Sequence, residues 1–230
     1  MVGPNAGNAV SARDVVLARI ASARAGAPVP AVPREYSRVG RHAAGSAEVL
    51  DLLEDRLRDY KAGVRRCAAA DIPGIVADLL GDASAIAPPG LDRTWAPGAT
   101  VDDGSLDALG LDGFDAVVTA AAAAAAETGT IVLDSSPTTG RRALTLVPDH
   151  HVCVVFASQV VHSIPELLQR LEPTRPLTFV SGPSATSDIE LQRVEGVHGP
   201  RRLDVVLVIP PPRSHVVPLE EPRSSRRGAT

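Results

Sequence analysis

The sequence predicts an α/β protein in which a mainly parallel sheet is flanked by helices and preceded by an N-terminal helical appendage. Two observations lead to this prediction. From residue 71 onward, short apolar runs alternate with helical segments, which is the pattern of strands joined by crossover helices. The chain has 230 residues, 44% of them hydrophobic, which is enough to bury a domain-sized core. We expect a helical region over residues 1–70, an α/β core over 71–210 and an extended or disordered tail over 211–230.

Two helices are expected in the N-terminal region. Residues 12–24 form a short amphipathic pattern, which the proline-rich stretch 28–33 ends. The second helix is indicated by an apolar stripe whose members recur at helical spacing. The residues of this stripe are Leu50, Leu53, Leu57, Tyr60 and Val64. Because the pattern has only one apolar face, this helix needs a surface to pack against.

The α/β region is expected to contain two helices, at residues 75–80 and 163–171. The expected strands lie at residues 83–87, 114–119, 130–134, 144–147, 152–157, 177–180 and 203–209. The alanine run 120–126 favours a helix by propensity, but β-type residues follow it, so we expect a turn or short helix that becomes a strand before Glu127. In open parallel sheets ligands bind beyond the carboxyl ends of the strands, which is where we expect a site.

Composition argues against several classes of function. Aromatic residues make up 3% of the chain and the net charge is −4, which argues against nucleic-acid binding. Cys67 and Cys153 are the two cysteines and form no C-x-x-C pair, so this chain alone cannot ligate an iron–sulfur cluster or a structural zinc ion. Lys61 is the one lysine, which limits Schiff-base and phosphate-binding lysine chemistry. No apolar stretch has the length of a membrane span or signal segment, and we expect a cytoplasmic protein.

The first candidate site is a turn with a carboxylate and two hydroxyls. Glu127, Thr128, Gly129 and Thr130 precede an apolar run, and the glycine is suited to a tight turn. Glu127 could serve as a nucleophile or general base there. The alternative is a hairpin turn with ordinary surface polar residues.

The second candidate is the arginine pair Arg141 and Arg142, directly ahead of the expected strand 144–147. Paired arginines can clamp a carboxylate or phosphate bidentately, whereas the alternative is a solvated charged pair. Because successive residues of an extended chain point to opposite faces, at most one of the two is expected to reach a shared site.

The third candidate is the polar entrance to the strand at 152–157. Asp149 could orient His151 as a general acid or base. His150 and Cys153 also invite a metal hypothesis, but strand alternation places His151 and Cys153 on one face and His150 on the other. We therefore predict no metal site.

The fourth candidate is the polar segment 181–200, which glycine and proline punctuate. Ser187 and Glu190 have capping-box spacing, so the segment is expected to form a strand, a tight loop and a helix N-terminus that could hold an anion. Helix capping and turn formation account for part of its polarity, but not for all of it. Its candidate ligand-binding residues are Ser181, Gly182, Ser184, Thr186, Asp188, Glu190, Arg193 and His198.

Three motifs together resemble the lactate utilization protein C family. They are Glu-Thr-Gly-Thr-Ile-Val-Leu at 127–133, Arg-Arg-Ala-Leu-Thr-Leu-Val-Pro-Asp at 141–149, and Ser-Gly-Pro-Ser-Ala-Thr-Ser-Asp-Ile-Glu with Arg-Val-Glu-Gly-Val-His-Gly-Pro within 181–200. The resemblance implies a fold similar to sugar-phosphate isomerases and coenzyme A transferases. It also implies action with two iron–sulfur partner proteins, which would carry the clusters, in oxidising L-lactate to pyruvate. Where the family has a glycine-rich loop, residues 135–139 are Ser-Ser-Pro-Thr-Thr.

The leading hypothesis is a non-redox component of this lactate-oxidising system that binds a small carboxylate, another anion or a partner. One alternative is a stand-alone enzyme for a phosphorylated, coenzyme A-linked or folate-like substrate, with Glu127 as base and Arg142 as anion clamp. Another is a non-catalytic assembly protein whose basic N-terminal helices dock an acidic partner. The cleft hypothesis requires Glu127, Arg142, His151 and the segment 181–200 to converge in space.

Overall fold

A computed structural model describes residues 11–28, 31–187, 193–195 and 199–210. The chain divides into two units, Met1–Tyr36 and Ser37–Thr230. The first unit contains helix α1 (Ala12–Arg24), which confirms the helix expected there. Ser11 caps α1 because its hydroxyl accepts a hydrogen bond from the Asp14 backbone N–H. The expected tail 211–230 lies outside the described residues, and the expected boundary at residue 70 falls inside the second unit.

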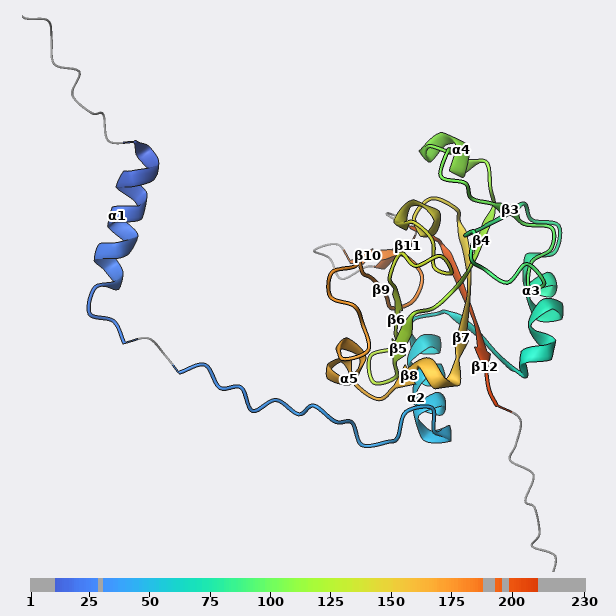
Figure 1. Cartoon of the computed structure of the whole chain (residues 1–230), viewed down its shortest axis with the longest axis horizontal. Coiled ribbons are helices and arrows are strands. Elements are labelled where there is room, and N and C mark those ends of the chain that lie inside the picture. Colours follow the sequence, from blue (N-terminus) through green and yellow to red (C-terminus); the bar gives the residue numbers. More distant parts are fainter. Residues whose placement is uncertain (1–10, 29–30, 188–192, 196–198, 211–230) are drawn as a thin grey trace, which may run out of the picture. The chain divides into compact units, whose positions relative to one another are not determined.

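The second unit is built around a six-stranded sheet in which every pair of neighbouring strands is parallel (Figure 1). In spatial order the strands are β1 (Gly63–Cys67), β12 (Arg202–Val208), β7 (His150–Phe156), β4 (Ala116–Ala120), β2 (Ala85–Ala87) and β3 (Thr100–Val101). Helices cover both faces, so the predicted α/β class with a parallel sheet is confirmed. The central strands are buried almost throughout, as expected for a sheet with two covered faces.

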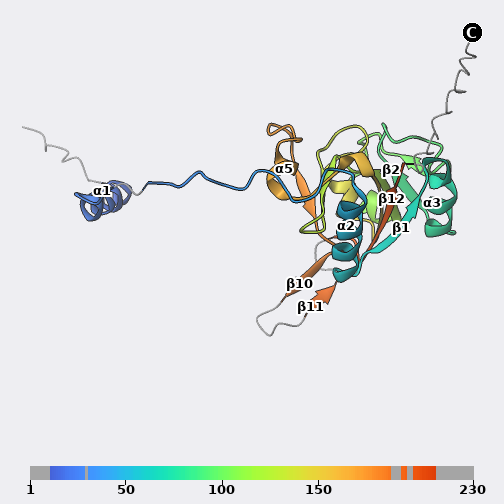
Figure 2. The ribbon, with the colours of Figure 1, turned by 90° about the horizontal axis from the view of Figure 1, so that it is seen from below.

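Two longer helices pack on opposite faces of this sheet (Figure 2). Helix α2 (Ala47–Asp59) buries its apolar stripe against one face, together with Cys153, Val155 and Leu203. Helix α3 (Ile72–Leu80) packs on the other face, which carries Val152 and Val154. The alternation along β7 therefore separates two core clusters. The shorter helical segments are η1 (Ala69–Asp71), α4 (Ala108–Asp112), η2 (Arg142–Thr145), η3 (Ala157–Gln159) and α5 (Ile164–Leu168).

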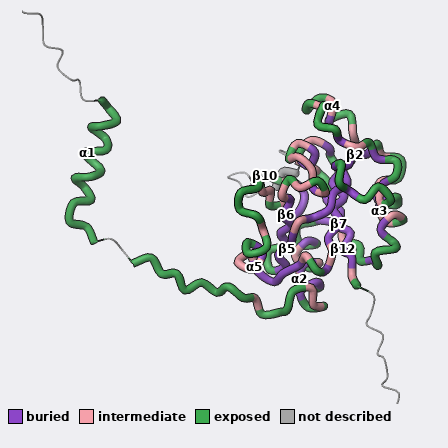
Figure 3. Tube along the Cα trace, in the orientation of Figure 1, coloured by how far each residue is buried: buried purple, intermediate pink, exposed green. Residues whose placement is uncertain are grey.

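A second sheet of four strands lies beside the α2 face of the first. Its order is β8 (Val160–Val161), β5 (Ala123–Ala125), β6 (Thr130–Leu133) and β9 (Thr178–Val180). The β5–β8 pair is parallel and the other pairs are antiparallel. A separate antiparallel hairpin joins β10 (Ala185–Ser187) to β11 (Arg193–Glu195). Figure 3 shows that both larger sheets are mostly buried within the second unit.

The alanine run carries the chain from one sheet directly into the other. Ala121 N–H still donates to Val154 of β7, whereas the next residue, Ala122, donates to Val132 of β6. The run continues as β5, so its strand ladder prevails over the helix propensity of alanine. The small side chains are almost entirely buried where the two sheets meet.

Two local expectations were wrong. The helix expected to reach Val64 ends at Asp59, and Lys61 adopts a φ of 66° that turns the chain into β1, which was not predicted. Residues 144–147 do not form a strand, because η2 occupies their first half. Ser187 is the last residue of β10, and Glu190, the other member of the expected capping box, lies outside the described residues. No helix within the described ranges is long and apolar enough to cross a bilayer.

Candidate functional site

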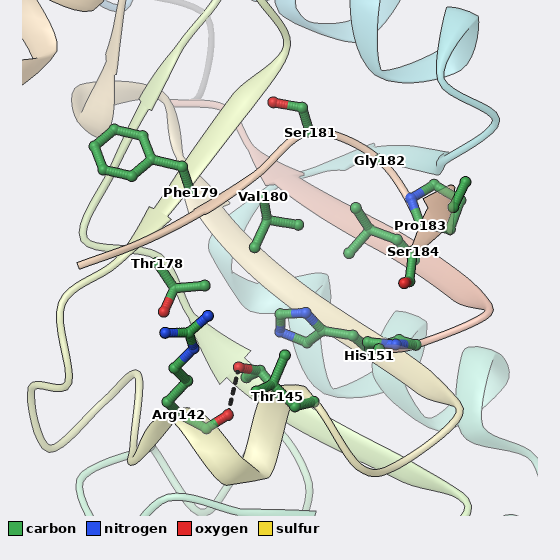
Figure 4. Close-up of a pocket in the computed structure, with 15 residues that line it drawn as sticks. Arg142, Thr145, His151, Thr178, Phe179, Val180, Ser181, Gly182, Pro183 and Ser184 are labelled. Atoms are coloured by element: carbon green, nitrogen blue, oxygen red, sulfur yellow. Dashed lines mark hydrogen bonds between the residues drawn. The ribbon is translucent and has the colours of Figure 1, made fainter. Parts of the chain in front are cut away.

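Several of the predicted site residues lie together around one hollow of about 300 Å³. Its walls come from η2, the start of β7, the segment from β9 to β10, and the start of β12. The lining residues include Arg142, Thr145, His151, Thr178, Phe179, Val180, Ser181, Gly182, Ser184 and Leu203. In Figure 4, Arg142 extends toward Thr178 and the His151 ring points into the space between Val180 and Thr145.

The hollow lies at the opposite end of the strands from the expected one. His151 and Leu203 are each the second residue of their strand, and they are paired in register. They therefore mark the amino ends of β7 and β12, not the carboxyl ends. At the carboxyl end of β4 the chain is covered instead by the loop 135–140, because Thr138 C=O accepts a hydrogen bond from Ala120 N–H.

This loop contains the Ser-Ser-Pro-Thr-Thr segment that stands where the family resemblance implies a glycine-rich loop. Its hydroxyl groups bond to one another, with Ser136 Oγ 3.3 Å from Thr138 Oγ1 and 3.2 Å from Thr139 Oγ1. Asp134 accepts from Ser136 N–H and from the Thr139 hydroxyl. These polar groups hold the loop closed on itself.

His151 is the most buried polar residue of the hollow, with 2% of its surface exposed. Its Nε2 lies 2.8 Å from the hydroxyl of Thr119, and that hydroxyl donates to Cys153 Sγ at 3.8 Å. Burial, helped by the neighbouring charge of His150, lowers the pKa of His151 to about 4. The imidazole is therefore neutral at neutral pH.

The remaining residues of this strand entrance have separate roles. Burial raises the pKa of Cys153 to about 12, which leaves an inert thiol. His150 points to the other face and bonds Asp204 at 2.8 Å, as strand alternation predicted. Asp149 is exposed and pairs with Arg201 at 3.5 Å, so Thr119 rather than Asp149 holds the His151 ring. Among the described residues, no group of three or more potential metal ligands occurs.

The arginine pair divides as strand geometry suggested, although its second member lies in a 3₁₀ turn. Arg141 forms a bidentate pair with Asp102, at 2.8 and 2.9 Å, and donates to Leu106 C=O at 2.7 Å. It is therefore a structural residue of the fold. Arg142 is exposed, lines the hollow and forms no ion pair with any described residue.

The loop after β9 supplies hydroxyls and backbone to the hollow. Gly182 has a φ of 85°, and a Cβ there would lie 2.5 Å from Tyr60 Cβ, so only glycine fits between the loop and the end of α2. Ser184 N–H donates to Pro200 C=O, which joins the two ends of the segment. Thr186 and Arg193 belong to the β10–β11 hairpin, whereas Asp188, Glu190 and His198 lie outside the described residues.

The residues of the turn 127–130 face two different hollows. Glu127 is exposed and lines a different hollow of about 320 Å³ with Arg41 and His162, so it does not share the site of His151 and Arg142. The two threonines beside it connect to the main hollow. Thr130 Oγ1 lies 2.7 Å from Thr128 Oγ1 and 2.9 Å from Ser181 Oγ.

Gly129 has a packing role in this turn. Its φ is 59°, and a Cβ there would lie 2.9 Å from the Cβ of Arg56 on α2. Gly129 and Gly182 thus both pack against the carboxyl-terminal end of α2. Sequence reasoning missed Thr119, Thr145, Thr178 and Leu203, because single threonines and leucines in apolar runs carry no pattern that separates them from core residues.

Comparisons with known proteins agree with this fold and with the segment that builds the hollow. Residues 109–208 match the LUD domain family, and all the hollow's lining residues fall inside that range. A lactate utilization protein C from Deinococcus radiodurans is 48% identical over 170 residues, covering 70% of this chain and 80% of the relative. A lactate utilization protein C from Bacillus subtilis is 34% identical, covering 36% of this chain and 38% of the relative.

A solved structure supports the same assignment. The crystal structure of a DUF162 family protein from Deinococcus radiodurans superposes with a TM-score of 0.62 at 38% identity, covering 75% of this chain and 99% of that chain. The similarity thus extends beyond the 109–208 segment to most of the second unit's length. The chain belongs to the lactate utilization protein C family of LUD-domain proteins.

Proposed function

We propose that this chain is a non-redox component of an iron–sulfur L-lactate oxidation system, and that its hollow binds a small carboxylate. The names of its relatives support a part in lactate utilization. The observation that carries the binding proposal is the placement of one exposed guanidinium opposite a neutral imidazole and several hydroxyls. Such a set is suited to a small polar anion.

The proposed division of labour follows from the positions of the cysteines. Cys67 and Cys153 are both buried, and they belong to core clusters on opposite faces of the sheet. They are not arranged as cluster ligands, so electron transfer is assigned to two iron–sulfur partner proteins. In this chain Arg142 would hold the carboxylate in a bidentate fashion, while Leu203 and Val180 would contact the apolar part of the ligand.

Complementation tests this proposal. A host that lacks the gene should fail to grow on L-lactate but grow on glucose, and the wild-type chain should restore growth. Arg142→Met should not restore it, whereas Arg65→Met, at an exposed arginine of β1, should do so. A tagged wild-type chain should co-purify with two cysteine-rich iron–sulfur proteins. Normal growth of the deletion strain on L-lactate would exclude the proposed role.

Calorimetry tests the binding step directly. Loss of a hydrogen-bonded charge is expected to weaken L-lactate binding by about tenfold to a hundredfold in Arg142→Met, with Arg65→Met unchanged. The stand-alone reaction that paired Glu127 with Arg142 has less support, because these residues line different hollows.

A further inference from the structure

The hollow lined by Glu127, which we call the Glu127 hollow, is not used by the proposed function. Besides the Glu127 carboxylate, it is lined by the guanidinium of Arg41 and the imidazole of His162. Its volume of about 320 Å³ lies within the range of small-molecule sites. All of its lining residues belong to the second unit. A carboxylate, a guanidinium and an imidazole at one hollow can bind a polar ligand.

Glu127 and His162 are neighbours in this hollow. The Glu127 N–H donates to the His162 C=O at 2.9 Å, so the turn 127–130 is joined to the end of β8. His162 is 7% exposed, and its Nδ1 is buried without a hydrogen-bond partner among the described residues. A buried polar group without a partner destabilises a protein. The ring therefore has a hydrogen-bonding group to spare beside the Glu127 carboxylate.

Arg41 reaches the same hollow from the segment 37–46, which precedes α2. In this segment Gly40 packs so closely on His162 that a Cβ would lie 2.3 Å from the His162 Cβ. The Gly45 N–H donates to the Val160 C=O at 2.9 Å, which attaches the segment to β8. Arg41 lies between these two contacts, so its backbone position beside the hollow is fixed.

The charges of Arg41 and Glu127 are available to a ligand. Both residues are exposed, and neither side chain forms a hydrogen bond or ion pair with another residue in the part of the chain that the structure describes. The nearby carboxylate of Glu166 differs, because it accepts from the Ser163 N–H at 3.0 Å and from the Ser163 hydroxyl at 3.1 Å. The hollow thus offers one positive and one negative group that the fold does not use.

We propose that the Glu127 hollow is a second binding site, for a free α-amino acid with an apolar side chain. The Arg41 guanidinium holds the ligand carboxylate, and the Glu127 carboxylate and the His162 ring accept hydrogen bonds from the ligand ammonium group. A ligand with a single charge would leave one of the two protein charges unpaired. Val39 and Pro165 supply apolar surface for the ligand side chain.

Calorimetry on the full chain tests the need for both ligand charges. The probes are L-leucine and two analogues that each lack one charge, 4-methylpentanoate and 3-methylbutylamine. L-Leucine is expected to bind at least about tenfold more tightly than either analogue, because only L-leucine engages both charged side chains.

Variants test the assigned side chains. Arg41→Met and Glu127→Gln should each weaken L-leucine binding by about tenfold to a hundredfold. The matched controls Arg38→Met and Glu35→Gln, at exposed residues outside the hollow, should bind as the wild type does. His162→Phe keeps an aromatic ring without nitrogen and should weaken binding by about threefold to tenfold.

The two hollows share no lining residue, so their ligands are independent. Arg142→Met should leave L-leucine binding unchanged, and Arg41→Met should leave L-lactate binding unchanged. Absence of L-leucine binding to the folded wild-type chain would overturn the inference, and so would equal binding of L-leucine and both analogues, or unchanged binding in both Arg41→Met and Glu127→Gln. Each of these results would leave the proposed function intact.

Discussion

Replacing Arg141 with methionine should destabilise the second unit, because it leaves the buried carboxylate of Asp102 without its ion-pair partner. The Asp102 side chain is 5% exposed, and its two oxygens are both bonded by the Arg141 guanidinium. These hydrogen bonds raise the pKa of Arg141 further above its ordinary value. After the replacement, the Gly104 N–H at 3.2 Å remains as a donor to Asp102. The third bond of the guanidinium, to Leu106 C=O, is lost as well.

The size of the effect follows from burial. Breaking a buried ion pair costs about 3–5 kcal/mol, but the Arg141 side chain is 34% exposed, so solvent can partly compensate the carboxylate. We expect a loss of about 2–3 kcal/mol in the free energy of unfolding. For a unit of this size that corresponds to a fall in Tm of about 5–10 °C. Thermal unfolding followed by circular dichroism, with urea unfolding as a second measure, would detect it.

The neighbouring arginine is the matched control. Arg142→Met changes the same residue type at an exposed position without an ion-pair partner among the described residues, so its stability should stay within about 0.5 kcal/mol of the wild type. Adding Asp102→Asn to Arg141→Met removes the stranded charge and should recover part of the loss. An Arg141→Met protein with an unchanged Tm would refute the structural role assigned to this pair.

Three further outcomes are expected. Because His151 keeps a pKa of about 4 when folded and about 6.5 when unfolded, urea unfolding should show about 2 kcal/mol of stability lost between pH 7 and pH 5, and His151→Gln should remove most of this loss. Burial raises the pKa of Asp204, but the hydrogen bond from His150 and the nearby Arg202 outweigh it, so the pKa is lowered overall. The stability that this carboxylate contributes is fully present above its pKa in the unfolded chain, about 4, and is lost as the pH falls through its lower pKa in the folded protein. Asp204→Asn should therefore reduce the loss of stability at acid pH that urea unfolding measures. Gly182→Ala should cost about 2 kcal/mol, from its left-handed backbone and the contact with Tyr60, and should weaken L-lactate binding in calorimetry; unchanged values would contradict the packing argument.

Much of the fold could be predicted because buried parallel strands are continuous apolar runs. The strands β7 and β12 and the stripe of α2 were visible in this way. The strand β1 was not, because it is an edge strand with two arginines, one of which pairs with Asp51 on α2. The positive φ of Lys61, which separates α2 from β1, has no signal in a residue type that seldom adopts it.

The site was predictable only in part, because the sequence does not show at which end of the strands the hollow lies. Polar density identified the loop at 181–184, and strand alternation identified which face His151 would share with Cys153. Whether that face carries its hollow at the amino or the carboxyl end depends on how the second sheet covers it. The separation of Glu127 has a similar origin, since its N–H bonds to His162 C=O and the turn therefore leaves the sheet on the β8 side.

The passage of the alanine run between the sheets ties their folding together. A single peptide link separates the last bond to β7, made by Ala121, from the first bond to β6, made by Ala122. Neither sheet can slip by one residue without forcing the other to invert its side chains. The two sheets should therefore form and melt as one cooperative body, and the ligand hollow, whose walls are drawn from both, should lose its shape only when that whole body unfolds.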